Sequence, residues 1–264
     1  MNEYLVAIII GIVEGLTEYL PISSTGHMII VGHFLNFTGE KSETFEIFIQ
    51  LGAILAVFIL YIKRFIALLD FKTKDNFSGV NGLLKIAACC MPVSVLGLIF
   101  HKKIKLLLFN PTSVSIALIV GGIIILIVER KKINFSVMKL EDITLKNAFL
   151  IGIFQCFALI PGASRSGSMI IGGMLLGLSR TVAAEFSFII AVPIMVLATT
   201  LDLLKSYKIL DLNDAVVFGI GFITAFITAY FSVNFFINIL KKTDLAFFGY
   251  YRIILGLILY FVLL

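Results

Sequence analysis

The sequence predicts an all-α, polytopic membrane protein that forms one integral membrane domain over residues 1–264. Of its 264 residues, 60% are hydrophobic and 14% are charged, whereas a soluble domain is roughly half apolar and a quarter charged. Apolar segments of about 20 residues recur along the chain, which is the length of a spanning helix and not the alternating pattern of an outer-membrane barrel strand. The composition therefore excludes a soluble enzyme, a disordered protein and a secreted disulfide scaffold.

Six segments are predicted to span the membrane because of their length and apolar composition. They are residues 45–62, 82–101, 113–130, 181–201, 213–238 and 246–264. The connections between them are short and charged, as in His101 to Lys105, so none forms a separate domain. Most of the Lys and Arg residues behind the net charge of +5 lie in these connections, where they set topology, so we expect no nucleic-acid partner.

Two further segments, residues 4–37 and 147–179, are apolar but broken near the middle by a proline with Ser and Gly around it. The breaks are residues 20–27 and 160–167. As a helix, the arm after the first break would reach only about 16 Å, roughly half a bilayer, so each segment is predicted to be a re-entrant helical hairpin. Irregular backbone at membrane depth is tolerated only when it is buried in protein or lines a wet cavity, which makes both tips candidate sites.

The two halves of the chain also predict an inverted repeat, with repeat 1 over about 1–132 and repeat 2 over about 141–264. At an offset of about 140 residues, 11–14 matches 152–155, Pro21 matches Pro161 and 45–48 matches 184–187. Each half then consists of a hairpin and three transmembrane helices. Because three is odd, the second half enters from the opposite side, and the two tips meet near the midplane.

The charges of the connections predict the orientation. The side that follows the first span, side B, carries twelve Lys and Arg residues: Lys63, Arg64, Lys72, Lys74, Arg130, Lys131, Lys132, Lys139, Lys146, Arg180, Lys241 and Lys242. The opposite side, side A, carries six: Lys41, Lys102, Lys103, Lys105, Lys205 and Lys208. The positive-inside rule then makes side B cytoplasmic and both termini extracytoplasmic.

Charged and titratable residues at membrane depth need a reason, because each charge costs at least about 2.5–3.5 kcal/mol there. The set is Glu14, Glu18, His27, Glu46, Arg165, Glu185 and Arg252. Glu14 and Glu18 are four residues apart, so on a helix their carboxylates share one face and repel each other. Such a pair either binds a divalent cation, Mg²⁺ or Ca²⁺, or shares a proton and holds helices together.

The tips supply polar groups of a different kind. In the first tip, Ser23, Ser24 and His27 could provide a nucleophile and a general base, although Ser and Thr also bond to backbone where a proline breaks a membrane helix. In the second tip, Ser164 can cap the outgoing arm, and Arg165 beside that helix N-terminus suits phosphate oxygens. Alternatively, Arg165 pairs with a Glu of the first hairpin, or does both.

These residues resemble a known family. Residues 14–18 running into 20–27, and residues 159–167, strongly resemble the two signature motifs of the bacterial undecaprenyl-diphosphate phosphatases of the bacitracin-resistance type. Stretches at Phe45-Glu46, Glu185-Phe186 and Tyr251-Arg252 look like the same family, so the resemblance covers essentially the whole chain. One position departs from the family pattern: the second motif usually has Thr four residues after the Arg, where this chain has Met169.

The resemblance implies hydrolysis of undecaprenyl diphosphate, a polyprenyl diphosphate lipid, to the monophosphate and phosphate. This would recycle the lipid carrier of cell-wall synthesis in the bacterial inner membrane and confer bacitracin resistance. By the same resemblance, Glu14 and Glu18 would bind the metal, and Ser24 and His27 would be the catalytic hydroxyl and base. Arg165 would be the catalytic cation. The substrate-binding set would be Ser23, Thr25, Ser164, Ser166, Gly167 and Gln155.

A second function class stays open at this point. Inverted repeats with broken helices are typical of alternating-access carriers, so a secondary transporter or a polyprenyl-phosphate lipid flippase is the alternative. A carrier needs an anion clamp but no hydroxyl and base, which makes the set of Ser24, His27, Glu18 and Arg165 the discriminating feature. The oligomeric state is also open, with a homodimer as one option.

Overall fold

The computed structural model describes residues 2–72, 75–108, 110–206 and 214–263. Five of the described helices are long and apolar enough to cross a membrane. They are α3 (Glu40–Leu60), α5 (Gly79–Leu108), α6 (Pro111–Arg130), α9 (Arg180–Ser206) and α10 (Ala215–Leu240). In the described residues, the single β interaction is an isolated bridge between Val137 and Leu178. The prediction of an all-α, polytopic membrane protein is therefore confirmed.

The second and the sixth of the predicted spans compare with the structure in an informative way. The sixth predicted span is α11 (Ala246–Leu263), whose 18 residues rise about 27 Å, slightly less than the roughly 30 Å of a bilayer core. Helix α5 continues to Leu108, through the stretch from His101 to Lys105 that was predicted to be a connection. A charged stretch can prolong a helix beyond the membrane, so charge marks the end of a span and not the end of a helix. The predicted positions 213 and 264, and Lys74 and Lys208 of the charge count, lie outside the described residues.

Both predicted breaks are present. The first separates α1 (Glu3–Thr17) from α2 (Ser24–Leu35), and the second separates α7 (Leu145–Gln155) and the 3₁₀ turn η2 (Cys156–Leu159) from α8 (Arg165–Leu175). Each outgoing helix is preceded by a serine at positive φ: Ser23 has φ 67° and ψ 102°, and Ser164 has φ 70° and ψ 118°. This conformation is uncommon for a residue with a side chain, and it recurs at the same place in both tips.

The first arm of each hairpin packs closely against a helix of the other half of the chain. The first arm α1 packs against α10 of the second half, and α7 packs against α5 of the first half. A Cβ added at Gly15 would lie 2.6 Å from the Ala225 carbonyl oxygen, and one added at Gly152 would lie 2.3 Å from the Cys89 carbonyl oxygen. Small residues let membrane helices approach this closely. This packing between the halves is expected of an inverted repeat, which itself stays a prediction.

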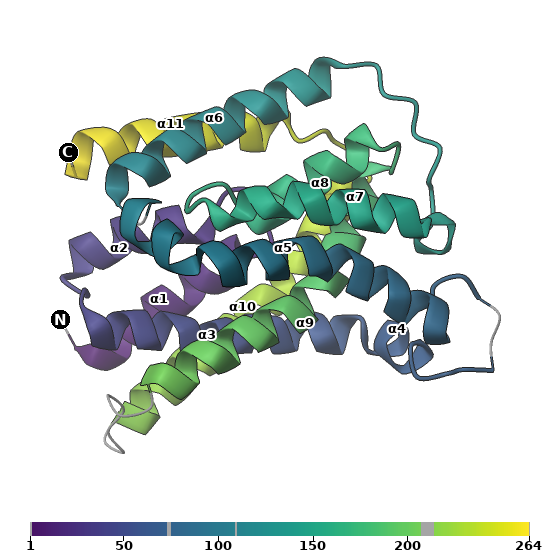
Figure 1. Ribbon diagram of the computed structural model, residues 1–264. Coiled ribbons are helices and arrows are strands. Elements are labelled where there is room, and N and C mark those ends of the chain that lie inside the picture. Colours follow the sequence, from purple (N-terminus) through teal and green to yellow (C-terminus); the bar gives the residue numbers. More distant parts are fainter. Residues whose placement is uncertain (1, 73–74, 109, 207–213, 264) are drawn as a thin grey trace.

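The two ends of the helix bundle differ. Figure 1 shows both described ends of the chain at one end of the bundle, and α4 (Ile62–Ala67) with the long connection between α6 and α7 at the other. That connection contains the 3₁₀ turn η1 (Leu140–Asp142) and is held by an ion pair of 2.5 Å between Arg64 and Glu141. Helices α6 and α11 lie along each other, and their contact brings α11 to the hairpin tips.

Candidate active site

The two hairpin tips are joined by Arg252 of α11. Its side chain is almost fully buried, and all five of its N–H donors reach backbone carbonyl oxygens. Nη1 donates to Pro21 of the first tip (3.2 Å) and to Ala163 of the second (3.0 Å). The other acceptors are the carbonyls of Gly162 at 3.0 Å, Ala117 at 3.2 Å and Leu118 at 3.4 Å. The sequence shows Arg252 only as a charge at membrane depth, so this joining role was missed although the signal was present.

Glu18, at the end of α1, is the point where the two hairpins meet chemically. The Ser24 Oγ donates to Glu18 Oε2 at 2.6 Å. The Arg165 Nη2 donates to Glu18 Oε1 at 3.3 Å, while Nη1 donates to the Ser187 carbonyl at 3.0 Å. Ser24 and Arg165 are the first residues of α2 and α8, each directly after the serine at positive φ. The equivalent positions of the two tips therefore supply a hydroxyl and a guanidinium to one carboxylate.

Arg165 keeps one donor unused. Its Nε is buried and has no hydrogen-bond partner among the described residues. The guanidinium also lies over the ring of Tyr19, with 5.4 Å between Cζ and the ring centroid. Arg165 therefore pairs with a Glu of the first hairpin, which was one of the alternatives from the sequence. Its unused Nε donor leaves it able to bind an oxyanion as well.

The structure places the predicted hydroxyl and base, Ser24 and His27, against different partners. In the described chain no hydrogen bond joins them, because the Ser24 hydroxyl is bonded to Glu18. The His27 ring turns back onto its own helix, with Nδ1 at 2.8 Å from the Ser23 carbonyl oxygen. Its other nitrogen, Nε2, lies 2.7 Å from the Tyr251 hydroxyl of α11. The acceptor placed for the Ser24 proton is thus Glu18.

The serines of the second tip bind the tips to each other. Ser166 is fully buried, and its hydroxyl donates to the Leu20 carbonyl at 2.7 Å. Its oxygen must therefore accept from the Ser164 hydroxyl, 3.1 Å away, and Ser164 in turn accepts from the Gly167 amide at 3.1 Å. This confirms Ser164 as the cap of α8. Thr25 is half-buried at the second position of α2.

Glu14 provides an unfilled polar position. Its side chain is buried, and its Oε1 has no hydrogen-bond partner among the described residues. A buried carboxylate oxygen without a donor needs a proton or a cation. In the described chain no three His, Cys, Asp or Glu side chains gather as a complete metal site, but Mg²⁺ is usually bound by one or two carboxylates together with substrate phosphates. Glu14 and Glu18 fit that kind of site.

Comparison with known proteins identifies the family of the chain. A family model described as bacitracin resistance protein BacA matches residues 7–258. The chain is 53% identical to an undecaprenyl-diphosphatase of Maridesulfovibrio salexigens over 99% of both chains. It is 48% identical to undecaprenyl-diphosphatase 1 of Bacillus cereus, over 98% of this chain and 97% of that one. The chain belongs to the BacA family.

Met169 and Gln155 of this BacA chain are both fully buried. Met169, at the position of the family's usual Thr, is fully buried in the apolar core, and the neighbouring Ser168 hydroxyl donates to the Ser164 carbonyl at 2.9 Å. Met169 has no hydroxyl, and the Ser168 hydroxyl donates its proton within the second tip. Gln155, predicted to bind substrate, is fully buried on α7 and donates through Nε2 to the Cys89 carbonyl at 3.4 Å. Its described contact is therefore with α5 and not with the group around Glu18.

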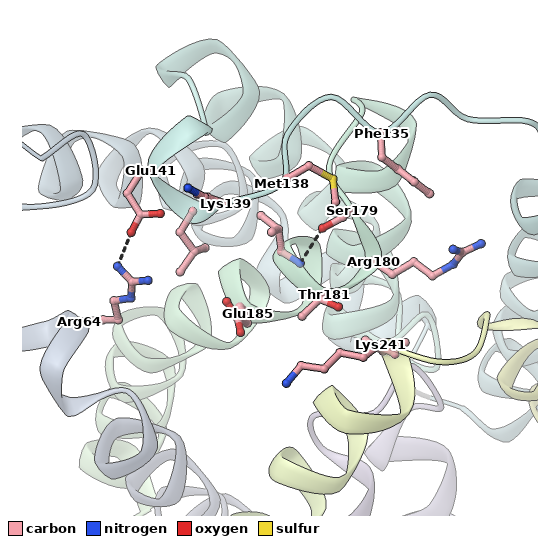
Figure 2. Close-up of a pocket in the computed structure, with 13 residues that line it drawn as sticks. Arg64, Phe135, Met138, Lys139, Glu141, Ser179, Arg180, Thr181, Glu185 and Lys241 are labelled. Atoms are coloured by element: carbon pink, nitrogen blue, oxygen red, sulfur yellow. Dashed lines mark hydrogen bonds and ion pairs between the residues drawn. The ribbon is translucent and has the colours of Figure 1, made fainter.

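The BacA chain also has a pocket of about 540 Å³ that is separate from the hairpin tips. It is lined by residues of α4, α9, the 131–144 connection and the end of α10, and by none of the predicted site residues. Figure 2 shows Arg64 directed to Glu141 across the pocket and Arg180 pointing away from it; Arg180 pairs with Glu129. The remaining cations, Lys139 and Lys241, are exposed. Both arginines of the pocket are therefore engaged by carboxylates.

Proposed function

We propose that this chain is a membrane phosphatase that hydrolyses undecaprenyl diphosphate to undecaprenyl phosphate and inorganic phosphate. The names of its full-length relatives support the substrate, and the activity would recycle the lipid carrier of cell-wall synthesis. The observation that carries the proposal is the junction of Ser24, Glu18 and Arg165 across the two tips. A carrier or flippase would need the cation but not the hydroxyl bonded to a carboxylate, so this junction favours the phosphatase.

The second tip binds the diphosphate in this proposal. The start of α8 presents backbone N–H groups and the positive end of a helix dipole, which favour phosphate. Arg165 adds a planar fork with an unused Nε donor. Ser164, Ser166 and Gly167 hold this start of the helix in place through their own hydrogen bonds. The prenyl chain would extend among the apolar helices that surround the tips.

The first tip supplies the chemistry. Ser24 Oγ attacks the terminal phosphorus, its proton passes to Glu18, and the bond from that phosphorus to the bridging oxygen breaks, so that undecaprenyl phosphate leaves. Water then attacks the phosphoester on Ser24 and gives a proton to His27. The Ser24 oxygen leaves phosphorus and recovers its proton from Glu18, His27 gives the proton it took from water to the departing phosphate, and phosphate is released. Hydroxyl nucleophiles activated by an adjacent base are a general solution for splitting one difficult step into two.

A divalent cation, Mg²⁺ or Ca²⁺, forms part of the proposal. Glu14 and Glu18 would hold it, and the partnerless Oε1 of buried Glu14 supports this choice. When bound, the cation would neutralise phosphate oxygens of the substrate. The carboxylate of Glu18 has lone pairs beyond those used by Ser24 and Arg165, so its hydrogen bonds do not exclude it as a ligand.

We further propose that the protein lies in the bacterial inner membrane with both termini extracytoplasmic. The twelve basic residues of side B against six on side A support this orientation through the positive-inside rule. Both described ends of the chain lie at one end of the bundle in Figure 1, which supports placing them on the same side of the membrane. The entrance of the first hairpin would then face the extracytoplasmic side.

The deciding experiment is phosphate release from undecaprenyl diphosphate by detergent-purified protein, with and without a chelator. Wild-type protein is expected to release phosphate and to lose this activity in EDTA. Ser24→Ala and Glu18→Gln should each lose at least about a hundredfold in kcat, the scale of general acid–base catalysis, while eluting as folded protein. Ser42→Ala removes a hydroxyl that is bonded at 2.7 Å at the start of α3 and should keep full activity.

Each arm can contradict one part of the proposal. Absence of phosphate release from well-folded wild-type protein would refute the phosphatase assignment, and transport of the prenyl phosphate between leaflets would then support the carrier alternative. Full activity in EDTA would refute the role of the metal. Wild-type turnover by Ser24→Ala would refute Ser24 as the nucleophile and indicate that water attacks phosphorus directly.

A further inference from the structure

The imidazole of His27 is bonded at both ring nitrogens to groups of different kinds. Nδ1 lies 2.8 Å from the Ser23 carbonyl oxygen, which can only accept, so Nδ1 carries a proton. Nε2 lies 2.7 Å from the Tyr251 hydroxyl, which can donate or accept. In the neutral ring Nε2 is an acceptor and the hydroxyl must donate to it. Among the described residues no carboxylate is bonded to either nitrogen, so no anion holds the ring in its charged form.

Tyr251 is placed to make this bond accurately. Its ring is nearly parallel to the His27 ring, with 9° between the two planes and 5.6 Å between centroids, and its hydroxyl lies 2.7 Å from Nε2. The next residue, Arg252, fixes this turn of α11 through carbonyls of both tips. The hydroxyl therefore stays in register with the first tip.

We propose that Tyr251 is a positioning residue that holds His27 as the neutral imidazole with its proton on Nδ1 and its lone pair on Nε2. The inference rests on the proposed function, because the neutral ring serves the second step of hydrolysis. Ser24 already has Glu18 as its proton acceptor. His27 is left as an oriented base for the water that follows.

The kinetic test compares two neighbouring tyrosines. Tyr251→Phe removes the hydroxyl and keeps the ring, whereas Tyr250→Phe removes a hydroxyl from a side chain that is 54% exposed on the same helix. Loss of a group that orients a metal-ligating histidine typically costs about 10–100-fold, and we expect an effect of the same order for a histidine that acts as a base. Tyr251→Phe is therefore expected to lower kcat at least about tenfold with KM within about twofold, because substrate binding depends on the other tip. Tyr250→Phe should match wild type, and equal kcat values for all three proteins would overturn the proposal.

A second measurement does not depend on turnover. The chain has 3 His, so His33→Gln and His101→Gln leave His27 as the single histidine for ¹⁵N spectroscopy of the ring. The expected spectrum near neutral pH has a protonated Nδ1 and an unprotonated Nε2, and Tyr251→Phe should change the Nε2 signal or the tautomer ratio while Tyr250→Phe should not. A proton on Nε2 in the Tyr251-containing protein would refute the positioning role. If the wild-type protein instead released no phosphate, the proposed function would fail while this spectrum still decided the state of His27.

Discussion

At the scale of single residues, the two tips use one backbone conformation for two kinds of chemistry. Ser23 and Ser164 share positive φ and each caps the helix that follows. The next residue is Ser24 in one tip and Arg165 in the other, and both side chains reach Glu18. The serine at positive φ thus directs the side chain of the following residue toward Glu18. Whether that residue is Ser or Arg determines whether the tip contributes a hydroxyl or a cation.

Arg165 gives the sharpest residue-scale prediction. Its two terminal nitrogens point to different acceptors, Glu18 and Ser187, and a lysine ammonium cannot reproduce this planar fork. Arg165→Lys is expected to lower kcat/KM by about 10–100-fold, since hydrogen bonds to charged groups contribute about 1.5–3 kcal/mol. Initial rates of phosphate release measure the effect. Arg130→Lys, at an exposed position on α6, is the matched control. Wild-type turnover by the Arg165 variant would leave Arg165 as a structural ion-pair partner only.

The site residues could be named from the sequence, but their pairings could not. Glu18, Ser24 and Arg165 stand out because polar groups at membrane depth are rare. That Ser24 is bonded to Glu18, and His27 to Tyr251, depends on how a positive-φ turn aims each side chain and on which helix covers the tip. Tyr251 lies 224 positions along the chain from His27, and no local pattern connects them.

At the scale of elements, the first arm of each hairpin depends on contact with a helix of the other half. In α7 this contact is between Gly152 and the backbone of Cys89 on α5. The apolar length of α5 and the break after α7 are visible in the sequence. Their contact is not, because glycine in a membrane helix marks a close approach without naming the partner.

Gly152→Val is accordingly expected to destabilise the protein. The added Cβ would lie 2.3 Å from the Cys89 carbonyl oxygen, so α7 must move away from α5, and overpacking of this kind typically costs about 1–3 kcal/mol. A lower midpoint in a thermal aggregation assay in detergent measures it. Gly219→Val is the control on α10, where an added Cβ meets none of the described atoms within 4 Å. Equal midpoints for the two variants would show that the α5–α7 contact is not tight.

At the scale of the whole molecule, the orientation follows from charges at the two ends of the bundle and can be measured directly. In a background without Cys89, Cys90 and Cys156, a single cysteine at Glu40 is expected to react with an impermeant thiol reagent on intact cells. A cysteine at Lys72 should react only after the cells are opened. Glu40 begins α3 and Lys72 follows α4, so they lie on opposite sides of one span. The reverse labelling pattern would overturn the assignment of side B to the cytoplasm.

The two halves are similar in element order but divide the chemistry unequally. In the repeat alignment Glu14 is aligned with Gln155, and Glu18 is aligned with Ala158 or Leu159. The second hairpin therefore has no acidic pair. Arg165 in turn has no basic counterpart among Ser23, Ser24 and Thr25 of the first tip. We therefore expect one asymmetric site across the two tips, with carboxylates and hydroxyl from the first hairpin and the cation from the second.

This asymmetry predicts that a carboxylate moved to the second hairpin cannot replace one lost from the first. Gln155 is fully buried and its amide donates to the Cys89 carbonyl, so Gln155→Glu would exchange a donor for a charge that faces an acceptor in an apolar setting. Combined with Glu14→Gln, it is expected to restore no phosphate release above that of Glu14→Gln alone, with activity normalised to folded protein from size-exclusion chromatography. Gln155→Met keeps the size without the charge and should be the better tolerated change. Appreciable recovery in the double variant would show that the two hairpins are interchangeable, and the one-site arrangement would then be wrong.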